Sequence, residues 1–70
     1  MFTLNDLFTV LNKDALIKIY YEYIGPKTCV VESRLGNITM DTIGKYLQYY
    51  VWDINIDKDC IVIAIRRDCI

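Results

Sequence analysis

The chain contains no histidine, and its cysteines, Cys29, Cys60 and Cys69, have no close pairwise spacing. Histidine is the usual general base near neutral pH and the commonest metal ligand in proteins. Scattered cysteines without a C-x-x-C spacing match neither a zinc site nor a disulfide framework. We therefore expect a protein that is not an enzyme and that carries no metal and no other cofactor.

Glycine, proline and long apolar runs are also scarce. The three glycines are isolated from one another, so no glycine-rich phosphate loop is present. No apolar run approaches the ~20 residues that a membrane helix requires. The first residues do not combine a basic region with an apolar run, as a signal peptide would. We expect a cytoplasmic protein that does not enter the membrane.

The charges nearly balance, with eight lysines and arginines against nine aspartates and glutamates. Nucleic-acid binders usually carry a basic excess, because neutralised phosphates supply their affinity, so nucleic acid is an unfavoured partner. Of the 70 residues, which form a single domain over 1–70, 54% are hydrophobic and 13% aromatic. That is more apolar surface than one small core readily hides, so we expect a homo-oligomer or a protein partner.

The last third of the chain predicts a β-hairpin. Within residues 50–56, Trp52, Ile54 and Ile56 alternate with polar side chains, as in a strand with one dry face. Residues 60–65 have no polar break and are rich in β-branched side chains, as in a strand covered on both faces. The polar residues 57–59 between them are of hairpin length. The second strand should therefore form the centre of the sheet.

The first two thirds predict a second hairpin and two helices. Thr3 caps a helix whose apolar face runs from Leu4 to Leu11. Residues 16–23 alternate as a strand, the turn falls at residues 24–27, and residues 28–33 return. Thr39 caps a second helix, which Gly44 weakens and whose apolar stripe runs from Met40 to Leu47. The order is α-β-β-α-β-β, an α+β fold with a four-stranded antiparallel sheet and both short helices on one face.

The sheet face opposite the helices is the first candidate binding surface. It should carry Tyr20, Val30, Val51, Val62 and Ala64, and aromatic residues are enriched at protein interfaces. The neighbouring residues Tyr49 and Tyr50 cannot both point inward at a helix-to-strand junction. The residues predicted to bind a partner are Tyr20, Tyr49, Tyr50, Val62 and Arg66. The alternative is a face covered by loops and by the stems of Lys18 and Arg66.

A second candidate is an anion site made by Lys18, Arg66 and Arg67, which could hold the phosphates of a nucleotide while a tyrosine stacks on its base. The alternative is that these charges protect a sheet edge from pairing with other chains.

A calcium loop is suggested by Asp53, Asn55, Asp57 and Asp59, but it fails at two positions. The required glycine is Lys58 and the required glutamate is Ala64.

The whole chain resembles a loose group of small proteins from phages and mobile elements of Firmicutes. The resemblance rests on three segments: Leu4-x-x-Leu7-Phe8-x-Val10-Leu11, then Ile17-Lys18-Ile19-Tyr20, and Tyr50-Val51-Trp52-x-Ile54 with Ile61-Val62-Ile63-Ala64-Ile65. Such accessory proteins often inhibit host defence, as anti-CRISPR or other anti-defence proteins. The resemblance maps no functional residue onto this chain.

The resemblance implies a non-enzymatic, phage-encoded inhibitor that binds a bacterial host defence protein. Two alternatives stay open from the residues. One is a homo-oligomeric binder, or sponge, of a signalling nucleotide, and the other is a structural or regulatory module of a phage or mobile element.

Overall fold

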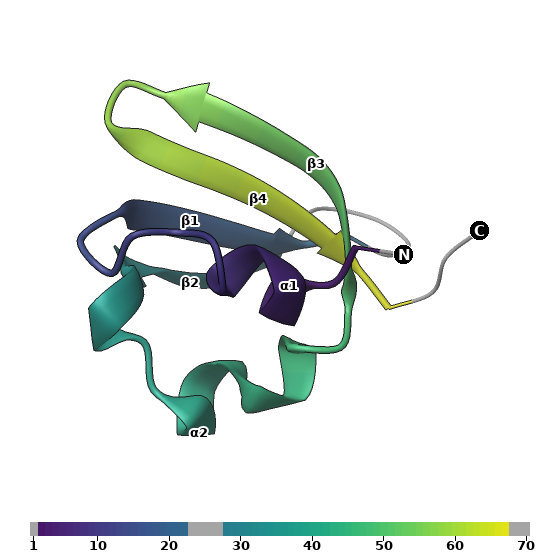
Figure 1. The fold of residues 1–70 in the computed structure, drawn as a ribbon. Helices are drawn as coiled ribbons and strands as arrows, with labels where there is room; N and C mark the ends of the chain where they lie inside the picture. The colour runs from purple at the N-terminus through teal and green to yellow at the C-terminus, as the bar shows by residue number, and fades with distance from the viewer. Residues whose placement is uncertain (1, 23–27, 68–70) are drawn as a thin grey trace.

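The computed structural model describes residues 2–22 and 28–67 (Figure 1). Its elements, in chain order, are α1 (Leu4–Phe8), β1 (Leu16–Tyr21), β2 (Thr28–Arg34), the 3-10 helix η1 (Leu35–Asn37), α2 (Met40–Ile43), the 3-10 helix η2 (Gly44–Tyr46), β3 (Tyr50–Asp57) and β4 (Cys60–Arg66). The predicted α+β class and the α-β-β-α-β-β order are confirmed. The predicted turn at residues 24–27 and the position of Tyr23 lie outside the described residues.

The four strands form one sheet in the order β2-β1-β4-β3. Each hairpin is antiparallel, as expected, but the two central strands, β1 and β4, run parallel, so the sheet is mixed. Each hairpin places its most apolar strand at the centre of the sheet, with the helix side of that strand in the core. These are the first strand of one hairpin and the second strand of the other, and in this arrangement they run in the same direction.

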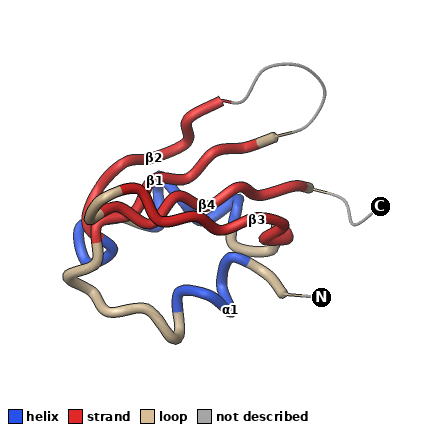
Figure 2. The backbone as a smooth tube through the Cα atoms, turned by 90° about the horizontal axis from the view of Figure 1, so that it is seen from above, coloured by secondary structure: helices blue, strands red, loops and turns tan. Residues whose placement is uncertain are grey.

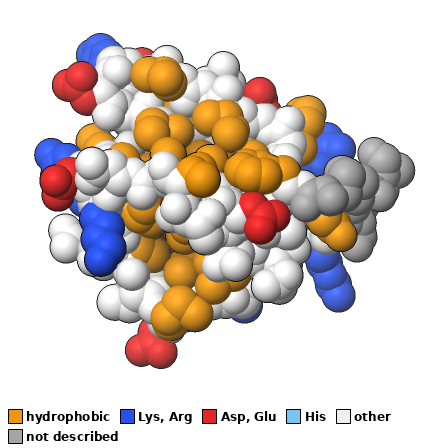
Figure 3. Space-filling view, viewed as in Figure 1, with side chains coloured by type: hydrophobic (Ala, Val, Ile, Leu, Met, Phe, Trp, Pro, Cys, Tyr) orange, Lys and Arg blue, Asp and Glu red, His pale blue; other side chains and the backbone are white. Residues whose placement is uncertain are grey.

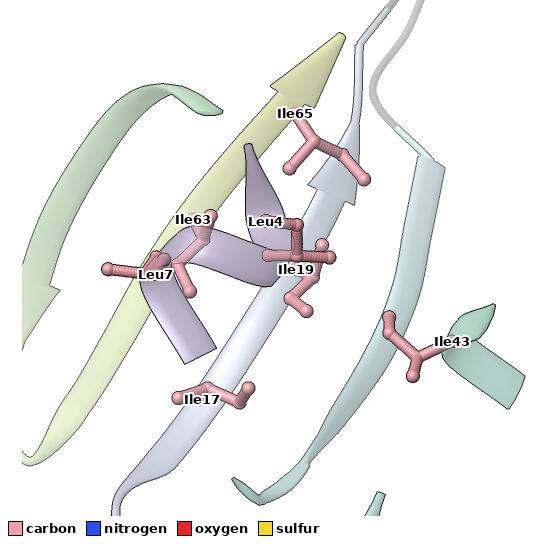
Figure 4. Packing of buried hydrophobic residues seen from close by; sticks show 7 residues of the cluster. All are labelled: Leu4, Leu7, Ile17, Ile19, Ile43, Ile63 and Ile65. Carbon is pink, nitrogen blue, oxygen red and sulfur yellow. The ribbon is translucent and has the colours of Figure 1, made fainter. Parts of the chain in front are cut away.

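The core lies between the sheet and the helices (Figure 4). Leu4 and Leu7 of α1 pack with isoleucines of β1 and β4, and Ile43 of α2 packs on the same side. Viewed from above, α1 lies to one side of the strands (Figure 2). The cluster consists of Leu4, Leu7, Ile17, Ile19, Ile43, Ile63 and Ile65. Among the described residues, no helix has the length and apolar character needed to cross a bilayer.

Both helices are shorter than predicted. The first has the expected cap, because the Asp6 amide donates to Thr3 Oγ1 at 3.2 Å and the Thr3 amide donates to Asp6 Oδ2 at 3.0 Å. It nevertheless ends at Phe8. The second helix continues as a 3-10 turn from Gly44, a residue that disfavours α-helix. Thr39 is the N-cap residue, as predicted, but its side chain makes no capping bond to a backbone amide, and its Oγ1 lies 3.2 Å from Thr42 Oγ1.

The outer sheet face, which is the face opposite the helices, does not carry all the residues predicted for it, because the sheet contains two β-bulges. The register shifts between Ile19 and Tyr20 on β1 and between Val51 and Asp53 on β3. A bulge opposes two residues to one and so changes the alternation of side chains. Val51 therefore pairs with the core residue Ile65, and Val30 also packs against the core. Neither valine belongs to the outer face.

Candidate functional site

The strand β3 lies at one edge of the sheet and carries large apolar side chains that the fold leaves exposed. The exposed fractions are 47% for Trp52, 44% for Ile54 and 77% for Ile56. A single exposed apolar residue is ordinary, whereas neighbouring ones on one strand mark an interaction surface. We therefore take β3 as the candidate functional site.

The open edge of β3 is closed only at its beginning. Thr3 forms an antiparallel bridge with Tyr50, and the Val51 amide donates to the Phe2 carbonyl oxygen at 2.9 Å. From Asp53 to Asp57 the strand pairs with β4 on one side, and no described residue pairs with its other side. Alternate residues of an edge strand direct their amide and carbonyl groups away from the sheet, where another chain could bind them.

Ile54 and Ile56 lie on the helix side of β3, and we call them the isoleucine pair. Ile54 pairs with the fully buried Ile63, and Ile56 pairs with Ile61, which packs against the core. The helix α1 spans only five residues and does not reach over the isoleucine pair. Figure 3, viewed as Figure 1, shows hydrophobic side chains gathered on this face over the region of β3 and β4. The apolar surface of the core therefore continues out to the sheet edge.

Trp52 is the extra residue of the bulge in β3, and its ring stacks with Arg66 of β4. The Arg66 Cζ atom lies 3.9 Å from the centre of the ring. Such a cation–π contact is worth about 0.5–1 kcal/mol when it is exposed. Tyr50 pairs with Arg66 across the two strands, so it lies beside this Trp52–Arg66 stack.

The outer side of the same edge is acidic. Asp53, Asn55 and Asp57 alternate with the isoleucine pair along β3, and all three side chains are exposed. The Asn55 side-chain amide donates to Asp53 Oδ2 at 3.0 Å. Within residues 2–22 and 28–67, no group of three His, Cys, Asp or Glu side chains is placed to hold a metal ion. Asp53 and Asp57 thus give the outer side of β3 an exposed acidic border.

Four of the five residues predicted to bind a partner lie on the outer face. Tyr20 pairs with Ala64, Val62 pairs with Lys18, and Arg66 pairs with Tyr50. Tyr20 and Val62 are half-buried and Ala64 is buried. The centre of this face is therefore less exposed than the sequence suggested, and the exposed apolar area lies at β3 instead.

The fifth predicted residue, Tyr49, lies on the helix side. Its ring packs edge-on against Tyr21 and Tyr46, with ring centres 5.3 Å and 5.2 Å away, and Tyr21 and Tyr46 are 6.1 Å apart. All three tyrosines pack against the core cluster. Edge-to-face pairs of this kind contribute about 0.5–1.5 kcal/mol each beyond area burial. Tyr49 therefore stabilises the helix side of the fold and lies apart from the other four residues.

The structure does not bring Lys18, Arg66 and Arg67 together. Lys18 pairs with Val62, which is four residues before Arg66 on β4, or roughly 13 Å along a strand. The Lys18 Nζ atom lies 3.9 Å from Glu32 Oε1 and 5.3 Å from the centre of the Tyr20 ring. The interaction with Tyr20 and then the charge of Glu32 raise the pKa of Lys18. Lys18 and Arg66 thus have separate neighbours, which are Glu32 and Tyr20 for Lys18 and Trp52 for Arg66.

The described thiols are also apart. Cys29 is exposed on β2 and Cys60 is half-buried at the start of β4, and both are free. Each sulfur lies 3.9 Å from a backbone carbonyl oxygen, that of Val31 for Cys29 and that of Ile61 for Cys60. Cys69 lies outside the described residues.

The sequence indicated the two faces of β3 but not which of them would be covered. The alternation of Trp52, Ile54 and Ile56 predicted a dry face, and the structure leaves the isoleucine pair exposed. The short apolar stripe of the first helix could have indicated this exposure, because a helix of two turns or fewer cannot cover four strands. Trp52 does not share the face of Ile54 and Ile56, because it is the extra residue of a bulge that the sequence pattern did not predict.

Fold and site together define a small α+β domain with a mixed four-stranded sheet and one open, apolar edge strand. No family model, curated protein or solved structure matches the chain.

Proposed function

We propose that the protein acts by binding another protein through β3 and covering part of that partner's surface, without catalysis. The observation that carries this proposal is the exposure of Trp52, Ile54 and Ile56 on one edge strand whose outer edge is unpaired among the described residues. Burying such side chains supplies binding energy, and the unpaired backbone supplies hydrogen bonds.

The residue types at β3 are those that dominate protein interfaces. Tryptophan, tyrosine and arginine are the residues whose truncation costs most in protein complexes, and Trp52, Tyr50 and Arg66 are neighbours here. The stacked Arg66 is held against the indole ring before a partner arrives, which lowers the entropy lost on binding. Tyr20 and Val62 extend the same face toward the centre of the sheet.

The target class in this proposal is a bacterial host defence protein, including CRISPR effectors. The support is the resemblance of the chain to small phage and mobile-element proteins, together with a compact domain that offers contact surface. Inhibition would follow from steric occlusion, which requires no catalytic group. Cytoplasmic location belongs to the same proposal.

Phage plating on bacteria that carry single defence systems tests this function. The wild-type protein should restore plating against at least one system, and Trp52→Ala combined with Ile56→Asp should abolish the effect. With the purified target, Trp52→Ala should weaken binding by roughly 30-fold, the effect of losing about 2 kcal/mol.

Met40→Gln is the matched control, because Met40 is exposed to a similar degree, 67%, but lies on α2. It should inhibit as well as the wild type. Equal inhibition by all three proteins would remove β3 from the proposal. Failure against every defence system would remove the target class.

Signalling-nucleotide binding stays a prediction of the sequence. A thermal-shift screen with nucleotides tests it, because a tight ligand raises the melting temperature by mass action.

A further inference from the structure

We infer that the open edge of β3 accepts an extended segment of its partner as an added strand, and that this segment alternates basic and aliphatic residues. The inference rests on the proposed function and deepens it by giving the binding mode and the chemistry of the partner. It is carried by the length of the free edge and by the different character of its two sides.

The free edge has the length of an ordinary strand. Phe2 and Thr3 occupy the edge at Tyr50 and Val51, so an added strand has the stretch from Asp53 to the hairpin end at Asp57. Five residues extend over roughly 17 Å, close to the usual strand length in globular proteins. Strand addition at such an edge gives affinity through backbone hydrogen bonds and specificity through alternate side chains.

The two sides of the edge select opposite chemistries. On the helix side, the isoleucine pair would contact aliphatic side chains of an added strand and extend the core apolar surface over them. On the outer side, Asp53 and Asp57 stand two positions on either side of Asn55. Opposite charges placed across neighbouring strands stabilise the pairing, so lysine or arginine fits beside each aspartate.

The same charges argue against a second copy of this chain as the occupant. Antiparallel self-pairing centred on Asn55 would place Asp53 of each copy opposite Asp57 of the other. Like charges directly opposite one another destabilise a strand pair. No lysine or arginine lies between Asp53 and Asp57 to relieve this repulsion. The homo-oligomer expected from composition is therefore disfavoured in this register of the β3 edge.

The test uses the full chain and three synthetic peptides, followed by NMR of the backbone amides at peptide concentrations up to the millimolar range. The first peptide alternates lysine and valine, the second alternates glutamate and valine, and the third is the lysine–valine peptide with alternate amides methylated. The lysine–valine peptide should shift and protect amides of residues 53–57, and the other two peptides should not.

Two variants test whether the carboxylates of Asp53 and Asp57 contribute to peptide binding. Asp53→Asn with Asp57→Asn should weaken binding of the lysine–valine peptide by roughly 2- to 30-fold, because two cross-strand charge pairs are lost. Asp41→Asn, which removes one carboxylate from α2, is the control and should leave the affinity unchanged. Added salt should weaken binding to the wild type more than to the double variant.

Three results would overturn the inference: no perturbation by the lysine–valine peptide, perturbation at β2 instead of β3, or self-association of the protein that protects residues 53–57. These results are distinct from failure of the proposed function. Peptide binding without any effect on phage plating would leave the strand-addition mode standing. Inhibition that depends on Trp52 and Ile56, without peptide binding, would leave the function standing.

Discussion

The two edge strands, β2 and β3, both carry apolar side chains on the helix side of the sheet, but the fold covers them unequally. On β2, Val31 packs against the core, and α2 lies beside the strand. On β3, Ile54 and Ile56 remain exposed. The difference follows from chain connectivity, because the segment after β2 leads through η1 into α2, which contacts that strand.

The outer sides of the two edges differ as well. Glu32 of β2 lies 3.9 Å from Lys18 of the neighbouring strand, so opposite charges meet within the domain. On β3, Asp53 and Asp57 share their side of the strand with Asn55 and with no basic residue between them. An edge with its apolar side covered and its charge paired suits a monomer. The β3 edge has neither feature, which is why we propose that a partner binds there.

An aspartate placed on the helix side of each edge strand should destabilise the protein far more on β2 than on β3. Val31→Asp should lower the free energy of unfolding by about 2 kcal/mol or more, because it buries a carboxylate against the core. Ile56→Asp should change it by less than about 0.5 kcal/mol, since that side chain is already exposed. Urea denaturation at unchanged m-value measures both. Equal losses would mean that Ile56 is covered in solution.

A substitution in the turn that ends β3 should raise the free energy of unfolding, by less than Val31→Asp lowers it. Lys58 has a φ of 58° in the two-residue turn between Asp57 and Cys60, while Asp59, the other turn residue, is not in the positive-φ region. A positive φ at the first turn residue alone is typical of a type II′ turn, which favours glycine at that position. Lys58→Gly should raise the free energy of unfolding by about 0.5–1 kcal/mol, which corresponds to a few degrees in melting temperature.

Asp59→Gly is the matched control for this turn, because it adds the flexibility of glycine without relieving a strained backbone. It should lower stability slightly. Stabilisation by both variants would show that the hairpin end is limited by something other than the Lys58 backbone.

The strands could be predicted from sequence because their apolar patterns are long and clear. The unbroken run from Cys60 to Ile65 is found at the centre of the sheet, as expected. The parallel pairing of β1 with β4 could not be predicted, because it depends on how the two hairpins dock and not on either hairpin alone. Local alternation carries no information about that docking.

The candidate site was only partly predictable for the same reason. The sequence predicts Tyr50 and Arg66 as contact residues, and in the structure both lie beside Trp52. Tyr49 was grouped with them, although the structure packs it with two other tyrosines. The exposure of the isoleucine pair depends on how far α1 extends over the sheet, and helix ends are weakly encoded when tertiary packing decides them.

The smallest effect concerns the capping box that holds the N-terminal segment against the start of β3. Hydrogen bonds from the Thr3 backbone and then its hydroxyl lower the pKa of Asp6. Because the folded-state pKa is the lower one, this stabilisation is present above the unfolded-state pKa of about 3.9 and is lost as the pH falls through the folded-state value. The stability gap between wild type and Asp6→Asn should therefore be larger at pH 7 than below about pH 3.

Hydrogen exchange at Val51 connects this titration to the β3 edge, because the Val51 amide donates to the Phe2 carbonyl next to the capping box. Its protection, corrected for intrinsic exchange, should fall at low pH in the wild type and should already be low at pH 7 in Asp6→Asn. A lower pH would then lengthen the free edge toward Tyr50. Protection that is equal in both proteins at both pH values would show that the start of β3 is closed independently of Asp6.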